Sequence, residues 1–330
     1  MTIKTLLVSA SNDVGRDARF DLACDLAKAF HARLIGVGAC ALEAVPTDPF
    51  WAGAMTGELL GLYRDMAAQE VSEGRSSFEI VAAARAVETG WIGMIEHPAT
   101  VLNAAARAAD LILVAGPNDT TPFRGPDPVE VITGAGRPVL VVPAAPLASP
   151  LGRPAVIAWK DSRESRLAAA AALPLLKKAR DAHVLAVCPE DQADIANIQL
   201  ADVAAWLGRH GVKASSEVLV RNETKTARRL LDRAAALNAG LIVAGAYGHL
   251  RLTEWVLGGV TRSLLADSEA LSAHGAVDGR RRPLARPSGR GLAAPRSGLP
   301  SLGFRSLVQR RSGEQRCPTV KPTGSNASAG

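Results

Sequence analysis

The sequence predicts an α/β fold made of two tandem three-layer α/β/α domains with parallel sheets. Short apolar runs rich in Val, Ile and Leu alternate with longer segments of helical spacing, which is typical of βαβ units. The pattern restarts after a proline-rich segment. With 330 residues, the chain is also longer than one usual domain.

The first copy is expected at residues 1–145. Its expected strands are residues 5–10, 34–38, 91–95, 111–115 and 138–142, and its helices are residues 16–30, about 51–87 and 100–109. The strands are short runs without polar alternation, as in a sheet that is covered on both faces. Residues 146–153 are expected to be a stiff, proline-rich linker.

The second copy is expected at residues 154–268. Its expected strands are residues 155–159, 183–188, 215–220 and 241–245, and its helices are residues 164–180, 195–210, 224–237 and 260–266. Residues 108–116 match residues 238–245, and residues 32–38 match residues 182–188. This internal repeat predicts that the two copies pack as an intramolecular pseudo-dimer.

A glycine-rich stretch after the strand at 241–245 carries the candidate site. Its glycines are Gly245, Gly248, Gly258 and Gly259, and a helical pattern begins at Val260. Glycines allow backbone amides to approach a ligand closely, and the start of a helix carries positive charge. The stretch therefore favours a bound phosphate, although the same glycines could simply form a tight strand-to-helix turn.

The repeat, the strand order and the spacing Gly245-x2-Gly248-x9-Gly258 together resemble the tandem form of the universal stress protein family. The resemblance covers about residues 3–268. It implies five parallel strands per domain, with ATP or another adenine nucleotide on this loop and the adenine near the end of the first strand. It also implies that the repeats meet through their fifth-strand edges or the adjoining helices.

Several positions depart from the pattern of the ATP-binding members. Gly259 stands where those members have Ser or Thr, so Thr261 could supply the hydroxyl instead. Lys160 takes the place of an Asp, which moves Asp161 along by one residue. The first copy has no carboxylate at the matching place and lacks the glycine spacing in residues 116–125. A nucleotide is therefore expected in the second copy only.

The candidate nucleotide-binding residues are Gly245, Gly248, His249, Gly258, Gly259, Val260, Thr261, Trp159 and Asp161. Trp159 could stack on a base or close the end of the sheet. His249 could donate to a phosphate or be an exposed loop residue without a role. No nucleophile–base pair, carboxylate dyad or metal-ligand spacing stands out, so the sequence predicts neither a catalytic site nor a metal site.

The net charge of +6 arises at the end of the chain. Residues 272–330 carry ten Arg and one Lys against Asp278 and Glu314, a net of +9, so residues 1–271 sum to −3. The folded part is therefore not expected to bind nucleic acid. Residues 269–330 show no periodicity, so the last strand of the second domain is expected to be missing and these residues to be disordered. They represent either a frameshifted end or a functional basic arm.

Composition also bounds the compartment and the function. Cys24, Cys40, Cys188 and Cys317 lie far apart, which favours free buried thiols over disulfides or a metal site. No apolar run of about 18 residues is present, so no membrane span is expected and the protein is placed in the cytoplasm. The expected role is stress response with nucleotide binding in the second domain. The alternatives are an interaction protein that keeps the fold but not the site, and an ATP-cleaving enzyme, which the missing catalytic groups disfavour.

Overall fold

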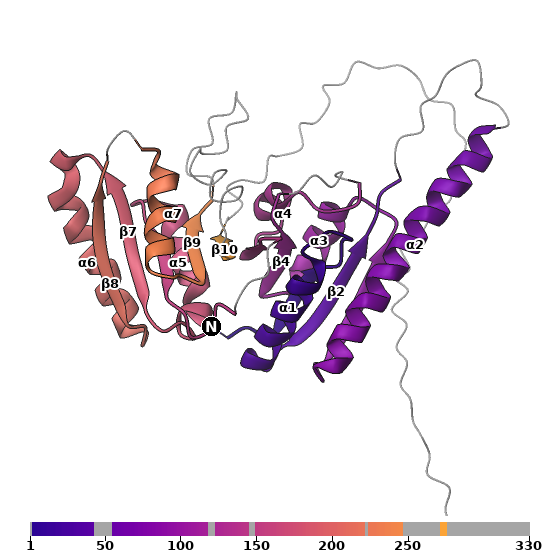
Figure 1. The fold of residues 1–330 in the computed structure, drawn as a ribbon, viewed down its shortest axis with the longest axis horizontal. Helices are drawn as coiled ribbons and strands as arrows, with labels where there is room; N and C mark the ends of the chain where they lie inside the picture. Colours follow the sequence, from indigo (N-terminus) through magenta and orange to yellow (C-terminus); the bar gives the residue numbers. More distant parts are fainter. Residues whose placement is uncertain are drawn as a thin grey trace, which may run out of the picture. The chain divides into compact units, whose positions relative to one another are not determined.

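The computed structural model describes residues 2–42, 55–117, 123–144, 149–221, 224–246 and 271–275. Their strands form one ten-stranded sheet in the order β3-β2-β1-β4-β5-β10-β9-β6-β7-β8 (Figure 1). The first half of the chain (residues 2–144) contributes β1 to β5, and the second half (residues 149–275) contributes β6 to β10. Both halves have the same strand order from the outer edge to the centre, which confirms the predicted tandem α/β fold.

The first half follows the strands and helices expected from its sequence and adds one short helix, at residues 128–134, that was not predicted. Its strands are β1 (Thr5–Ser9), β2 (Arg33–Ala39), β3 (Thr89–Met94), β4 (Leu111–Ala115) and β5 (Val139–Val142). Its helices are α1 (Arg16–Phe30), α2 (Met55–Ala84), α3 (Pro98–Ala105), the 3-10 turn η1 (Ala106–Ala108) and α4 (Pro128–Gly134). Helix α4 begins at Pro128 because the Asp127 side chain accepts a hydrogen bond from the Val129 amide at 2.8 Å.

The second half repeats this alternation. Its strands are β6 (Ala155–Ala158), β7 (Ala182–Cys188), β8 (Ala214–Val220), β9 (Leu241–Gly245) and β10 (Leu271–Gly275). Its helices are α5 (Arg163–Leu176), η2 (Glu190–Gln192), α6 (Ala193–Arg209) and α7 (Thr226–Ala236). The helix expected at 260–266 lies outside the described residues.

Helices cover both faces of the sheet and form the three expected layers. On one face, α1, α2, α5 and α6 bury a core that includes Phe20, Phe78, Leu176 and Leu200. On the other face, α3 and α4 cover the first half and α7 covers the second. The central strands are buried on both faces, which explains their uninterrupted apolar sequences. No helix in the described ranges is long and apolar enough to cross a membrane.

The two halves join through their fifth strands, which is one of the two contacts that the resemblance implied, although the strand of the second half was expected to be missing. β10 pairs antiparallel with β5, with Ala273 opposite Leu140, while both strands run parallel to their neighbours β9 and β4. By their registers with β9 and β4, Ala273 and Leu140 are equivalent positions of the two copies. The pairing is therefore symmetric about this point, as in the isologous interface of a two-fold dimer.

The strand β10 corrects the prediction that the second domain lacks its last strand and that the chain is disordered from residue 269. Leu271–Gly275 is fully paired, to β9 on one side and to β5 on the other. Its sequence, Leu-Ser-Ala-His-Gly, contains no β-branched residue and so has no strand pattern. Two flanking strands supply its hydrogen-bond partners, and this tertiary context overrides the weak local preference.

Candidate functional site

The strand order reverses between β1 and β4 in the first half and between β6 and β9 in the second. In open α/β sheets, ligands bind outside the carboxyl ends of the strands at such a reversal. Each half therefore has one place where a ligand site is expected. In the second half this place is bounded by the turn from β6 to α5 and by the end of β9.

Trp159 directly follows β6 at this place. Its backbone N–H donates to the Leu185 carbonyl of β7 at 2.7 Å, which continues the ladder by one residue. The half-buried ring packs against the apolar core. Its indole Nε1 is buried, and none of the residues that the structure describes accepts its hydrogen bond. A buried indole N–H normally finds an acceptor, so Trp159 offers a hydrogen-bond donor at this end of the sheet.

The turn from β6 into α5 is held by two serines. The Ser162 hydroxyl caps the helix by accepting from the Ser165 amide at 3.3 Å, and the Ser165 hydroxyl accepts from the Lys160 amide at 3.4 Å. The candidate Asp161 is exposed and forms an ion pair with Arg166 at 2.9 Å. Its carboxylate is thus engaged at the surface of α5 rather than at the strand end.

Gly245, the last residue of β9, has a packing reason to lack a side chain. A Cβ at this position would lie 2.7 Å from the carbonyl carbon of Glu164 and 2.7 Å from the amide nitrogen of Ser165. The first turn of α5 therefore rests directly on the end of β9. Close packing of a helix start on a strand end is one of the roles of glycine in nucleotide-binding α/β folds.

The structure thus brings together two of the candidate residues, Trp159 and Gly245, at the ends of β6 and β9, whereas the carboxylate of Asp161 lies at the surface of α5. The other candidates lie outside the described residues; they are Gly248, His249, Gly258, Gly259, Val260 and Thr261. Their roles remain predictions.

The equivalent place in the first half is filled by the side chain of Arg19. Its guanidinium donates to the Ser9 carbonyl at 2.9 Å, to the Ser11 carbonyl at 3.2 Å and to both oxygens of Asp13 at 2.7 and 2.9 Å. The Arg19 and Asp13 side chains are 0% and 4% exposed. This buried, satisfied ion pair occupies the strand end where the second half has the indole of Trp159.

Helix α2 also lies directly against the end of β1 in the first half. At Gly74, helix α2 comes so near to β1 that a Cβ would lie 2.7 Å from the Ala10 carbonyl oxygen. Sequence analysis noted the missing carboxylate of the first copy but missed both Arg19 and Asp13. The five residues between Asp13 and Arg19 span a loop and a helix start, and no spacing rule indicates the contact.

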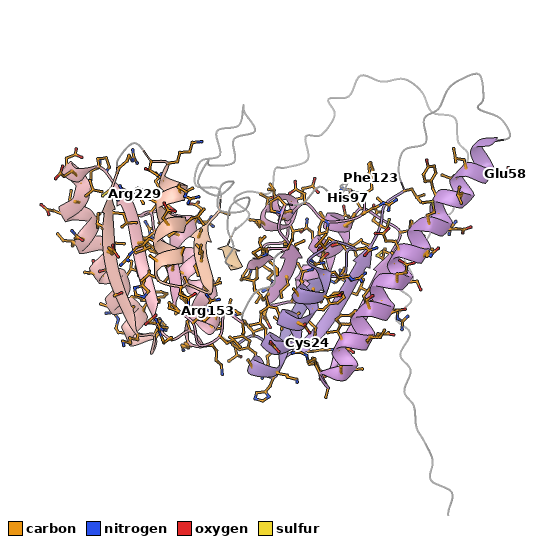
Figure 2. All side chains as sticks on the ribbon, in the orientation of Figure 1. Cys24, Glu58, His97, Phe123, Arg153 and Arg229 are labelled. Carbon is orange, nitrogen blue, oxygen red and sulfur yellow. The ribbon has the colours of Figure 1, made fainter. Side chains whose placement is uncertain are left out.

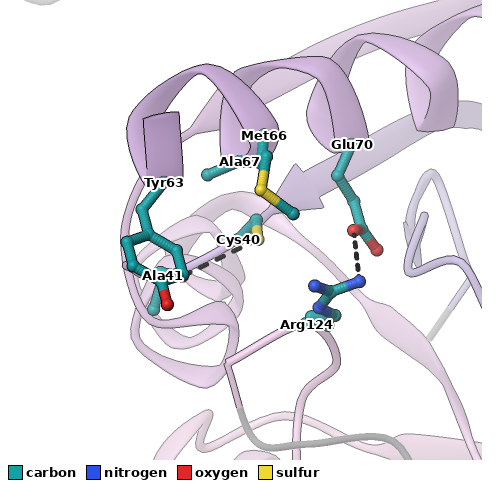
Figure 3. A pocket seen from close by; sticks show the side chains of 7 residues that line it. All are labelled: Cys40, Ala41, Tyr63, Met66, Ala67, Glu70 and Arg124. Carbon is teal, nitrogen blue, oxygen red and sulfur yellow. Dashed lines mark hydrogen bonds and ion pairs between the residues drawn. The ribbon is translucent and has the colours of Figure 1, made fainter. Parts of the chain in front are cut away.

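The described part of the chain also contains a hollow of about 50 Å³ under the N-terminal half of α2 (Figure 3). It is lined by Cys40, Ala41, Tyr63, Met66, Ala67, Glu70 and Arg124. Glu70 and Arg124 form an ion pair of 3.4 Å at its rim. About one water molecule fits such a volume, so the hollow does not accommodate a nucleotide.

The thiols of the described residues match the expectation of free cysteines. Cys24 and Cys40 are buried, and Cys188 is half-buried at the end of β7. Burial raises the pKa of the Cys24 thiol from 9.0 to about 11. Cys24, labelled in Figure 2 on α1, therefore stays protonated at neutral pH. In the described ranges, no group of three or more His, Cys, Asp or Glu side chains could hold a metal ion.

Comparison with known proteins gives structural relatives only. No family model matches the chain, and no curated protein matches it. A universal stress protein from Archaeoglobus fulgidus is similar over 83% of this chain and 96% of its own length, with a TM-score of 0.66 at 15% sequence identity. A functionally unknown protein from Pseudomonas aeruginosa is similar over 82% and 92%, with a TM-score of 0.50 at 16% identity. The TM-scores and the coverage show a common fold, and at such low identities the likeness extends to the fold alone.

Proposed function

We propose that this chain, which has the fold of the tandem universal stress proteins, acts in the cytoplasmic stress response by binding an adenine nucleotide in its second half. The observation that carries the proposal is the contrast between the two strand reversals. The first is filled by Arg19 and Asp13, whereas the second presents the buried indole N–H of Trp159, for which the described residues supply no acceptor. The glycine-rich stretch that follows β9 supports a phosphate at the same end of the sheet.

The proposed role is binding rather than turnover. In the β6–α5 turn, the carboxylate of Asp161 is paired with Arg166, the Ser162 hydroxyl caps the helix, and the Ser165 hydroxyl accepts from the Lys160 amide. These groups are committed to holding the turn, so they supply no free acid and base for hydrolysis. Trp159 would contact the base, and the stretch with Gly248 and Gly258 would hold the phosphates.

A nucleotide-independent interaction protein is the second candidate. The close contact at Gly245 favours it, because that glycine is required by the packing of α5 whether or not a ligand binds. In this case the glycine-rich stretch would only preserve the fold, and Trp159 would close the end of the sheet.

Binding to the full chain separates the two candidates. We expect adenine nucleotide in the supernatant of denatured, freshly purified protein by mass spectrometry, and saturable ATP binding by calorimetry once it is removed. Gly248→Val should abolish this binding because a side chain keeps phosphate from the backbone. The control Gly116→Ala, at a strand end of the first half, should bind like the parent.

Trp159 provides a second readout. ATP should change the tryptophan emission of the parent protein, and Trp159→Phe should remove most of that change while the protein remains folded. If no nucleotide co-purifies and calorimetry shows no binding of ATP, ADP or AMP by the folded chain, the nucleotide proposal is wrong and the interaction protein remains.

A further inference from the structure

Three side chains at the opposite end of the second half lie in a line, with one hydrogen bond and one charge contact between them. The Ser215 hydroxyl oxygen lies 2.9 Å from His183 Nδ1, and His183 Nε2 lies 3.4 Å from Asp181 Oδ1. All three belong to the amino ends of β7 and β8, near Arg153, which Figure 2 labels at this end of the second half. The line is therefore separate from the proposed nucleotide site.

The register of the two strands creates this contact. His183 of β7 and Ser215 of β8 are direct partners in the parallel ladder, so their side chains project from the same face of the sheet. Asp181 lies two residues before His183 and projects to that face as well. The residues are 32 positions apart in sequence, so sequence spacing does not reveal the contact.

The surroundings of Asp181 favour one tautomer of the histidine. Asp181 Oδ1 is buried without a hydrogen-bond donor among the described residues, and Arg180 Nε donates to Oδ2 at 3.2 Å. A proton on His183 Nε2 would place a donor 3.4 Å from Oδ1. Nδ1 is then unprotonated and accepts the Ser215 hydroxyl. A hydroxyl, a base and a carboxylate that orients the base are the arrangement that activates a serine nucleophile.

Ser215 is open to solvent, because β8 is the outermost strand and the residue is exposed. His183 and Asp181 are 22% and 21% exposed, so the base is partly shielded while the nucleophile is accessible. Along an outermost strand, alternate backbone N–H groups have no strand partner. The bonds from Ala182 N–H to Lys213 O and from Arg221 N–H to Cys188 O place the Ser216 N–H on that outer side.

We propose that Ser215 is an activated hydroxyl that accepts an acyl group from small, activated acyl esters. Ser215 Oγ attacks the ester carbonyl carbon, and its proton moves to His183 Nδ1. The bond between the carbonyl carbon and the leaving oxygen then breaks, and the leaving oxygen takes that proton. The products are acylated Ser215, the free alcohol or phenol, and neutral His183. The single outward N–H of Ser216 is the available donor for the developing oxyanion, which restricts the reaction to good leaving groups.

Charged groups from three parts of the chain lie near His183. They are Asp181 and Arg180 before β7, Lys213 and Glu217 on and beside β8, and Arg233 of α7, which pairs with Glu217 at 2.8 Å. Because Glu217 and Arg233 pair with each other, Asp181 is the anion beside the ring.

Acetylation by p-nitrophenyl acetate tests the proposal on the full chain. Peptide mass spectrometry should find the acetyl group on Ser215, and Ser215→Ala should lose it. His183→Gln should slow acetylation by about 10²-fold or more, which is the usual contribution of a general base. Asp181→Asn should slow it less and alter its pH profile, as expected for a positioning residue.

The neighbouring Ser216 is the matched control, since it is also exposed but projects from the opposite face. Ser216→Ala should be acetylated on Ser215 at the parental rate. A second pair, Ser215→Cys and Ser216→Cys, should differ in alkylation by iodoacetamide, with the thiol at 215 reacting faster. Equal labelling of Ser215 and Ser216, an unchanged rate in folded His183→Gln, or an adduct confined to Lys213 would overturn the proposal.

Discussion

The same helix position carries an arginine in both halves, but one side chain is buried and the other is exposed. Arg19 and Arg166 are each the fourth residue of the helix that follows the first strand of their half. Arg19 turns inward and is 0% exposed against Asp13, whereas Arg166 is 59% exposed and pairs with Asp161 at the surface. One half fills its strand reversal with an internal ion pair, and the described residues of the other half do not.

The difference lies in the connecting loop. Residues 10–15 join β1 to α1, whereas the shorter stretch 159–162 joins β6 to α5. The longer loop brings Asp13 back toward the strand end, where its carboxylate also accepts from the Gly15 amide at 3.0 Å. In the first half, a loop longer by two residues accompanies an internal guanidinium at the place where a ligand would lie. A longer loop after the first strand, with an Asp in it and an Arg on the next helix, therefore indicates that a duplicated domain has lost its ligand site.

Removal of the fifth strand of the second half is expected to change the free energy of unfolding more than any other variant considered. A chain that ends at residue 270 loses β10, which leaves β5 and β9 without their shared neighbour. We expect its free energy of unfolding to fall by roughly 3–6 kcal/mol, the equivalent of two buried Val- or Leu-sized side chains. A chain that ends at residue 276 keeps β10 and should match the full chain in urea denaturation. Equal stability of the two shortened chains would contradict the role of β10.

The two arginines give the next largest contrast. Arg19→Met leaves the Asp13 carboxylate buried without its partner, so we expect a loss of about 3–5 kcal/mol in the free energy of unfolding. Arg166→Met removes an exposed ion pair and should cost less than about 1 kcal/mol. Adding Asp13→Asn to Arg19→Met should recover part of the loss, because the unpaired charge is then gone. Similar losses for Arg19→Met and Arg166→Met in urea titrations would refute the buried-versus-exposed comparison.

A glycine pair gives the smallest effect. Gly245→Ala places a methyl group 2.7 Å from the backbone of α5, so the helix must shift, and we expect a loss of about 1–3 kcal/mol. At Gly116, after β4 of the first half, the nearest atom to an added Cβ is 3.7 Å away. Gly116→Ala should therefore leave the free energy of unfolding unchanged or raise it by up to about 1 kcal/mol, because alanine lowers the conformational entropy of the unfolded chain. Thermal unfolding of both variants measures the difference, and a neutral Gly245→Ala would show that α5 does not rest on β9.

The parts of the fold that were predictable are those encoded by local pattern. The buried runs at 111–115, 139–142 and 241–245 have no polar alternation, so the parallel sheet and its repeat follow from the sequence. Strand β10 does not, because Leu271–Gly275 is a strand only by virtue of β5 and β9. The resemblance predicted that the halves meet through their fifth strands or the adjoining helices. The sequence of β10, however, gave no indication that this segment forms a strand.

The candidate site was predictable in position but not in detail. Trp159 and Gly245 lie at the ends of β6 and β9, where the sequence placed them. The inward turn of Arg19 and the contact of Ser215 with His183 depend on side chains meeting across a loop or across two strands. Residue spacing does not indicate either contact, because the three-dimensional fold brings these side chains together and no fixed sequence interval does.

The central position of β10 also has a consequence for synthesis on the ribosome. Strand β5 is made early, but its sheet neighbour is the last strand described in the chain. At about 5–20 residues per second, the roughly 130 residues between them take on the order of ten seconds to translate. During this interval, the nascent first half holds the apolar strand Val139–Val142 with β4 on one side and no strand on the other. Neighbouring ribosomes on one message expose the same edge together, so nascent copies can pair through it before β10 is made.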